Sequence, residues 1–280
     1  MPQSQNPSRE HPSEEPLEPF TRSDELSGRV AVVTGVGRRR GIGSAVCRAL
    51  AARGADVALS YWKAYDRGMP WDPDEEEPRR LVEELGGGGV RAAAVEVDLS
   101  RAGSPKELLD AVDERLGVPS ILVNVAAHST RDGYERLDAE TIDDHHAVNV
   151  RAMALLSVLF ARRYPGGPGG RIVNFSSGQS LGPMQDELAY GMTKGAIEAF
   201  TRSLAASVGH KGITVNAVNP GPTDTGWIPE ELGRKLLPKF PAGRIGQPED
   251  AARLVAFLAG DEAAWITGQI IHSEGGFVRG

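Results

Sequence analysis

The sequence predicts an α/β fold in which helices cover both faces of a seven-stranded parallel sheet. Short apolar runs rich in valine, isoleucine and alanine alternate with longer segments of helical periodicity. A glycine-rich turn joins the first apolar run to the first helix, and we find neither an internal repeat nor a second apolar core. The 280 residues, 40% of them hydrophobic, are enough to bury one large core. Together these observations indicate a single doubly wound, Rossmann-type domain.

The first 27 residues differ in character from the rest of the chain. They are rich in proline, serine and glutamate, carry six acidic and two basic residues, and show no apolar periodicity. We therefore expect residues 1–27 to form a disordered tail and residues 28–280 to form the folded domain. Because the net charge of the chain is −7, the body that follows the tail is close to balanced.

Composition argues against several classes of protein. The sequence has no basic run suited to nucleic acid. Its longest apolar stretch, Met153–Ala161, is too short to cross a bilayer, and no secretory signal is recognisable. The single cysteine, Cys47, rules out an internal disulfide and suits a small buried side chain in a reducing cytoplasm. We expect a soluble, cytoplasmic protein with no nucleic-acid or membrane partner.

Apolar runs and helical periodicity place the elements of the first half of the domain. The run that starts at Arg29 and ends in glycine is the first buried strand, and Gly54 stops the helix that follows. The further strands expected are Asp56–Ser60, Arg91–Val97 and Ile121–Asn124, and the further helices are Glu75–Leu85 and Pro105–Leu116.

An insert at residues 61–80 interrupts this alternation. It contains three prolines and an acidic run, and connections of this length are usually functional or disordered. The sequence leaves two roles open: the insert clasps the adenosine half of a nucleotide, or it projects into solvent.

The second half of the domain continues the same alternation. We expect helices at Ala139–Arg163, Glu187–Val208 and Pro248–Ala259, and strands at Arg171–Phe175, Thr214–Val218 and Gln269–His272. The last of these helices opens with proline followed by two acids, residues that suit a helix N-terminus. Residues 228–241 hold several prolines and are expected to be mobile.

Tyr190 and Lys194 stand four residues apart, so in a helix their side chains share one face. An unperturbed phenol titrates near about 10, and a neighbouring ammonium stabilises the phenolate. The pair therefore predicts a general acid or base tuned toward neutral pH. The hydroxyl of Ser177, thirteen residues before the tyrosine, would hold a substrate oxygen beside the phenol. This chemistry reduces a carbonyl or oxidises an alcohol.

The glycine-rich turn predicts a nucleotide site, because backbone N–H groups at a helix start meet a pyrophosphate there. Its candidate glycines are Gly35, Gly37, Gly41 and Gly43, and either of the first two suits the first motif position. An NAD site usually has a carboxylate at the end of the second strand, whereas this chain has Tyr61 in the sequence Ser-Tyr-Trp.

Basic residues favour a cofactor with a ribose 2′-phosphate over NAD(H). Arg38, Arg39 and Arg40 lie in the glycine loop, and Lys63 follows the second strand. Guanidinium groups bind a 2′-phosphate well, although three arginines also suit an exposed loop. We therefore expect NADP(H) as the cofactor.

Seven short motifs occur along the chain, and their order points to a protein family. They are Thr34-Gly35 with Gly41-Ile42-Gly43, Asp98-Leu99, Asn124-Val125-Ala126-Ala127, Asn149, Ser177, Tyr190 with Lys194, and Pro220-Gly221. From about Leu26 onward, the chain resembles the short-chain dehydrogenase/reductase family in its one-domain form. The general resemblance is to 3-oxoacyl-carrier-protein reductases, which does not define the substrate.

The resemblance implies a role for each motif residue. Tyr190 would be the acid/base, Lys194 its partner and a ribose ligand, Ser177 the substrate orienter and Asn149 the anchor of a water molecule. The implied cofactor-binding residues are Gly35, Gly37, Arg39, Arg40, Gly41, Ile42, Gly43, Tyr61, Asp98, Leu99, Asn124, Ala126, Tyr190, Lys194, Pro220, Gly221, Thr223 and Thr225. Asp98 would meet the adenine, although aspartate also commonly caps a turn. The family also implies a homotetramer.

Two departures from the family pattern stand out. The usual asparagine pair after the fourth strand is here Asn124-Val125, so one side chain that ties neighbouring strands is absent. Five residues instead of three separate Gly35 from Gly41, which resembles the enoyl-acyl-carrier-protein reductase branch. That branch places six residues between its tyrosine and lysine, and at that position this chain has Glu187. Enoyl reduction therefore remains only an alternative.

The reaction expected is reversible hydride transfer between NADP(H) and a carbonyl, either a ketone or a 3-oxoacyl group. Residues expected to border the substrate are His128, Met184, Gln185, Trp227 and residues 228–241. His145 and His146 are adjacent in a helix and face different ways, so we expect no metal site. A protein that binds NADP(H) as a sensor or scaffold, without turnover, is the alternative from another class.

Overall fold

The structure is a computed structural model that describes residues 19–68, 74–226 and 228–279. Trp227, residues 69–73 of the insert and residues 1–18 of the predicted tail lie outside the described residues. Within the described residues, no helix combines the length and the apolar character needed to span a membrane.

One parallel sheet of seven strands runs through the molecule in the order β3-β2-β1-β4-β5-β6-β7, which confirms the predicted fold class. The strands are β1 (Val30–Val33), β2 (Asp56–Tyr61), β3 (Ala92–Glu96), β4 (Ile121–Asn124), β5 (Gly170–Phe175), β6 (Ile213–Asn219) and β7 (Ile270–His272). From β1 the chain builds the sheet outward first to one side and then, from β4, to the other. The carboxyl ends of β1 and β4 therefore flank the switch point at which ligands bind in such sheets.

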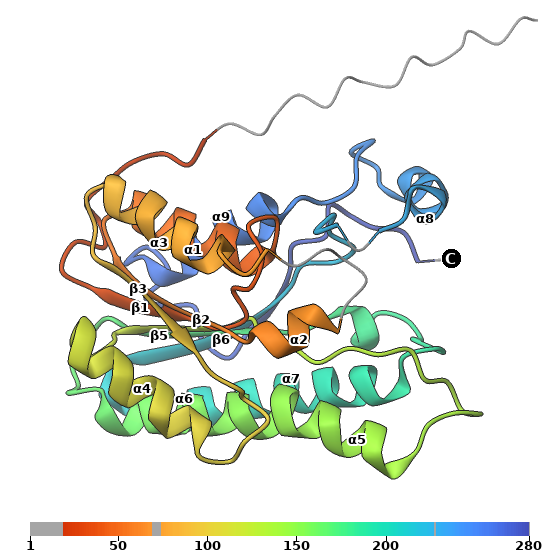
Figure 1. Ribbon diagram of the computed structural model, residues 1–280, viewed down its shortest axis with the longest axis horizontal. Coiled ribbons are helices and arrows are strands. Elements are labelled where there is room, and N and C mark those ends of the chain that lie inside the picture. Colours follow the sequence, from red (N-terminus) through yellow and green to blue (C-terminus); the bar gives the residue numbers. More distant parts are fainter. Residues whose placement is uncertain (1–18, 69–73, 227, 280) are drawn as a thin grey trace, which may run out of the picture.

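Two layers of helices cover the sheet (Figure 1). One layer contains α1 (Ile42–Ala52), α3 (Glu77–Gly87) and α9 (Pro248–Ala259), and the other contains α4 (Ser104–Arg115), α5 (Ala139–His145), α6 (Met153–Arg163) and α7 (Leu188–Val208). Successive strand residues face opposite layers, so Ala31 and Val33 join one core cluster while Val30 and Val32 join the other. Both faces of the sheet are buried, which explains why its strands are continuously apolar.

Two short helices lie outside this three-layer arrangement. Helix α2 (Lys63–Arg67) lies within the insert, just beyond the carboxyl end of β2, and had no clear signal in the sequence (Figure 1). Helix α8 (Glu230–Leu236) and a 3₁₀ turn at Leu237–Lys239 form the segment that was expected to be mobile.

The long helix expected at Ala139–Arg163 is helical throughout but changes its winding in the middle. Residues His146–Ala152 between α5 and α6 form a π-helical segment. Such segments are rare and occur frequently at functional sites. Asn149 lies within this segment.

The folded part of the chain begins before the predicted boundary at residue 28. Leu26 is completely buried, and its backbone N–H donates to the Arg53 carbonyl at 2.8 Å. The Ser23 backbone N–H donates to Ala52 at 2.9 Å, and Glu25 pairs with Arg53 at 3.0 Å. This short stretch is therefore docked on the C-terminal end of α1.

Candidate active site

Tyr190 and Lys194 lie on the first turns of α7, at the carboxyl edge of the sheet. The Lys194 Nζ lies 5.1 Å from the centre of the Tyr190 ring and donates to the Phe175 carbonyl oxygen, at the end of β5, at 2.8 Å. Lys194 is only 2% exposed. The spacing of four residues therefore places both groups on one helix face, as predicted.

The start of α7 is held by an aspartate that the sequence analysis missed. The carboxylate of Asp132 is 3% exposed and accepts from the backbone N–H groups of Leu188 at 2.7 Å and Ala189 at 2.8 Å. A carboxylate at this end also complements the helix dipole. Asp132 comes from a loop 56 residues earlier, so no local capping motif could have revealed it.

Ser177 lies in the loop after β5, which a second buried carboxylate holds. Glu198 of α7 is 6% exposed and accepts from Ser176 Oγ at 2.8 Å and from Gln179 Nε2 at 2.7 Å. The loop presents the Ser177 hydroxyl to the Tyr190 phenol, with which it forms a hydrogen bond. The structure therefore brings Ser177, Tyr190 and Lys194 together.

The electrostatics of this trio differ from the prediction. Burial raises the pKa of the Tyr190 phenol, the Glu187 carboxylate raises it further, and the hydrogen bond with Ser177 opposes these effects only in part. Burial also lowers the pKa of Lys194 to about 7. Only part of the lysine is therefore charged at neutral pH, and the phenol's pKa is raised where the sequence predicted that it would be lowered. The sequence spacing revealed the pairing but not the loss of hydration of both groups.

Asn149 connects the π-helical segment to the loop after β4. Its Oδ1 accepts from the His128 backbone N–H at 2.7 Å, and its Nδ2 donates to the His128 carbonyl at 2.9 Å and to Thr193 Oγ1 at 3.0 Å. Thr193 is on α7 between the tyrosine and the lysine. Asn149 thereby joins the wall of the crevice to the helix that carries Tyr190.

The glycine loop packs too closely for side chains at two positions. Gly35 has a φ of +73°, and a Cβ there would lie 2.7 Å from the Ala126 backbone. A Cβ at Gly43 would lie 2.8 Å from the Gly35 carbonyl oxygen. Gly35 is therefore the glycine that the turn requires, and Gly37 belongs to a lengthened loop. This tight turn at the start of α1 fits a dinucleotide's pyrophosphate.

The three arginines of the loop have different surroundings. Arg38 donates from Nη1 to the Thr225 carbonyl at 2.8 Å and so spans the crevice to the loop after β6. Arg39 pairs with Glu84 at 2.6 Å and Arg40 with Asp224 at 3.7 Å. Their side chains are 41% and 74% exposed, so these ion pairs are weak and a phosphate can compete for them.

The loop after β4 shows what replaces the family's second asparagine. Thr34 Oγ1 accepts from the backbone N–H groups of Val125 and Ala126, both at 3.1 Å. The Asn124 amide donates to Asn174 Oδ1 on β5 at 2.9 Å. Backbone bonds to a threonine hydroxyl and one asparagine pair therefore tie β1, β4 and β5 at the switch point.

The remaining predicted cofactor residues lie at the carboxyl ends of β3 and β6. Asp98 Oδ1 accepts from the Ser100 backbone N–H at 2.8 Å, the turn-capping role that the sequence left open. Gly221 has a φ of +63° and packs against Glu274. Thr223 Oγ1 bonds the carbonyl oxygens of Pro220 and Gly221 at 3.3 and 3.2 Å, while Leu99 is buried.

An aromatic cluster that includes Tyr65 of the insert lies beside the same crevice. The rings of Tyr65 and His128 are 5.9 Å apart, and those of His128 and His145 are 4.6 Å apart, edge to face in both cases. His145 is completely buried and its Nε2 accepts from the Thr130 backbone N–H at 3.2 Å. His145 is therefore a structural residue, and Tyr65 is a candidate site residue that lacks a sequence motif. Met184 is half-buried near Gly191, and Gln185 is exposed.

Comparison with known proteins decides the family. A family model described as "Enoyl-(Acyl carrier protein) reductase" matches residues 35–278. The chain belongs to the short-chain dehydrogenase/reductase family. It is 50% identical over 255 residues to the uncharacterized oxidoreductase YjdA of Bacillus subtilis, covering 90% of this chain and 98% of that protein. It is 37% identical over 262 residues to an NADPH-dependent aldehyde reductase-like protein of Arabidopsis thaliana, covering 90% and 95%.

A solved structure agrees with these relatives. The angucycline C-6 ketoreductase LanV with bound NADP has a TM-score of 0.80 and 33% identity, and the match covers 92% of this chain and 98% of LanV. The short-chain dehydrogenase/reductase assignment confirms the predicted family and the prediction of an NAD(P)-dependent oxidoreductase. The enoyl-reductase description belongs to the family model, whereas Glu187 stands where an enoyl-type tyrosine would be.

Proposed function

We propose that this short-chain dehydrogenase/reductase interconverts a ketone or 3-oxoacyl carbonyl and its alcohol with NADP(H), using Tyr190 as the acid/base. One observation carries the proposal: the Tyr190 phenol is hydrogen-bonded to Ser177 next to the buried Lys194. This trio lies at the carboxyl edge of a sheet whose switch point has the glycine loop. A protein that only binds nucleotide has no use for such an arrangement.

Each residue of the trio would have its own role in the reaction. Bound NADPH supplies the hydride. The Ser177 hydroxyl donates a hydrogen bond to the carbonyl oxygen and orients it beside the phenol, and Tyr190 then donates its proton to the forming alkoxide. A raised phenol pKa keeps Tyr190 protonated at neutral pH, which suits an acid in the reducing direction. Lys194 lies beside the phenol to stabilise the phenolate that remains.

NADP(H) is the cofactor that the loop supports best. Arg39 and Arg40 are exposed at the glycine loop, and β2 ends at Tyr61 with no carboxylate in the following two residues. The relative from Arabidopsis thaliana is described as NADPH-dependent, and LanV binds NADP. Replacing Arg39 and Arg40 together by alanine should raise the KM for NADPH by about 10-fold or more and leave that for NADH nearly unchanged. Equal turnover with NADH in the wild-type protein would contradict the proposed preference.

The test of the acid/base is oxidation of NADPH with a panel of ketones, aldehydes and 3-oxoacyl thioesters, followed by absorbance. Tyr190→Phe should lower kcat by at least about 100-fold, as expected for loss of a general acid, with NADPH binding retained. Tyr134→Phe is the matched control, because that phenol is 85% exposed. Unchanged activity of Tyr190→Phe would refute the mechanism. The homotetramer and the cytoplasmic location expected from the sequence remain predictions.

A further inference from the structure

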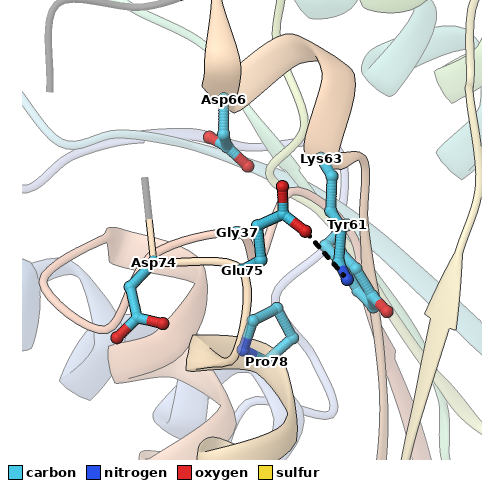
Figure 2. A pocket seen from close by; sticks show the side chains of 7 residues that line it. All are labelled: Gly37, Tyr61, Lys63, Asp66, Asp74, Glu75 and Pro78. Carbon is cyan, nitrogen blue, oxygen red and sulfur yellow. Dashed lines mark ion pairs between the residues drawn. The ribbon is translucent and has the colours of Figure 1, made fainter. Parts of the chain in front are cut away.

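Helix α2 of the insert lies against the glycine loop, and its Asp66 side chain is directed at Gly37 (Figure 2). A Cβ built on Gly37 would overlap Asp66 Oδ2 and lie 2.8 Å from Asp66 Cγ. The carboxylate therefore rests directly on the backbone of the loop. Gly37 is the extra glycine of the lengthened loop, and its missing side chain is what makes room for this contact.

The contact fills most of the space beside Gly37. Gly37, Asp66, Tyr61, Lys63, Asp74, Glu75 and Pro78 surround the space that remains (Figure 2). That space measures about 10 Å³, enough for about one water molecule, so no group of a dinucleotide fits beside Gly37 while Asp66 stays in place. Helix α2 therefore packs against the glycine loop and does not project into solvent, which was one of the two roles that the sequence left open for the insert.

Several individually weak contacts hold α2 in this position. Lys63 pairs with Glu75 at 3.6 Å between partly exposed side chains, and the Tyr65 ring meets His128 edge to face. The Arg38 guanidinium is close enough for the Asp66 carboxylate to raise its pKa against the lowering effect of burial. Arg67 pairs with the same Glu75 carboxylate, and exposed ion pairs of this kind contribute little to stability. Moving α2 would therefore break surface contacts and leave the two core clusters intact.

We propose that α2 is a gate on the dinucleotide crevice: Asp66 covers Gly37 in the closed state, and the bound cofactor displaces it. This inference rests on the proposed NADP(H) binding. A phosphate group of the cofactor that approaches the loop at Gly37 would meet the Asp66 carboxylate, and like charges repel. The affinity measured for NADPH is therefore the intrinsic affinity reduced by the fraction of molecules that are open.

The test is a titration of NADPH by its fluorescence, in the full chain without substrate. Asp66→Asn removes the competing charge, and we expect it to lower the Kd for NADPH by about 3- to 10-fold through a larger open fraction. Asp74→Asn is the matched control: Asp74 lines the same space but pairs with Arg80 at 2.6 Å, and its Kd should stay within about two-fold of wild type. Asp66→Ala serves as a second variant should Asp66→Asn fail to fold.

An equal or weaker affinity in both Asp66 variants would overturn the gate, since it would mean that the carboxylate holds Arg38 ready for the cofactor. Hydrogen exchange at Lys63–Gly68 gives an independent readout: NADPH should speed exchange in the wild type, and slower exchange would contradict the gate. NADPH binding by the variants but not by the wild type would support it strongly. If none of the proteins bound NADPH, both the proposed cofactor and this inference would fail.

Discussion

Lys194 Nζ donates to the Phe175 carbonyl oxygen at 2.8 Å, which joins α7 to the end of β5 through a side chain that is only 2% exposed. An amine held in this way keeps a hydrogen-bond partner but loses nearly all of its hydration. That loss lowers the pKa of Lys194 to about 7. Burial therefore determines how readily Lys194 loses its proton.

The first prediction concerns the pH dependence of stability. The pKa of Lys194 is about 7 in the folded protein and near 10.5 in the unfolded chain. Between these values the unfolded chain binds a proton that the folded protein has released, so stability should rise with pH. The slope is at most about 1.4 kcal/mol per pH unit. Lys194→Met should abolish this rise, as measured by urea unfolding at several pH values without cofactor. Lys235→Met, at a side chain 69% exposed, is the control, and an unchanged slope in Lys194→Met would contradict the assignment.

The second prediction concerns Glu187, the residue before α7. Its carboxylate raises the pKa of the Tyr190 phenol, so Glu187→Gln should lower that pKa. In alcohol oxidation the phenolate is the base, and the rise of rate with pH should begin at lower pH in the variant. The measurement is the pH profile of kcat with NADP⁺. Glu135→Gln, at an exposed position, should keep the wild-type profile. Coincident profiles for the wild type and Glu187→Gln would rule out the coupling.

The third prediction concerns Asp132, which accepts from two N–H groups at the start of α7. Asp132→Ala should destabilise the protein by about 1–2 kcal/mol, the usual cost of losing a helix cap. Because Tyr190 lies on the first turn of this helix, the variant should also lose kcat at temperatures where it remains folded. Asp138→Ala removes an exposed cap from α5, where Asp138 accepts from the Thr141 N–H at 2.8 Å, and should leave kcat unchanged. Equal kcat in both variants would show that α7 needs no such anchor.

The fourth prediction concerns Asn149. Asn149→Ala leaves the His128 N–H and carbonyl without their side-chain partner, so the free energy of unfolding should fall by about 2 kcal/mol. Thr193→Val removes only one of the hydrogen bonds of Asn149 and should cost less. Thermal unfolding of the two variants checks this order, and a larger loss in Thr193→Val would contradict it.

The sequence alone determined the succession of the seven strands and of the helices that cover the sheet, and the grouping of Ser177, Tyr190 and Lys194. These features follow from local periodicity and from motifs whose spacing the backbone converts directly into geometry. The predictions from the sequence agreed least with the structure where an element depends on contacts with distant segments. Residues 19–27 were placed in the tail because their composition is polar, although Leu26 supplies a fully buried contact to α1.

Only the tertiary structure showed in which direction the pKa of Tyr190 is shifted and which distant residues contact the site. Asp132 reaches α7 from 56 residues away, and Asp66 reaches Gly37 from an insert that has no motif. The direction of the pKa shift at Tyr190 depends on hydration that is lost only when the layers pack together. Contacts between segments far apart in the sequence, and the burial that they cause, are properties of the folded chain. No local sequence pattern predicts them.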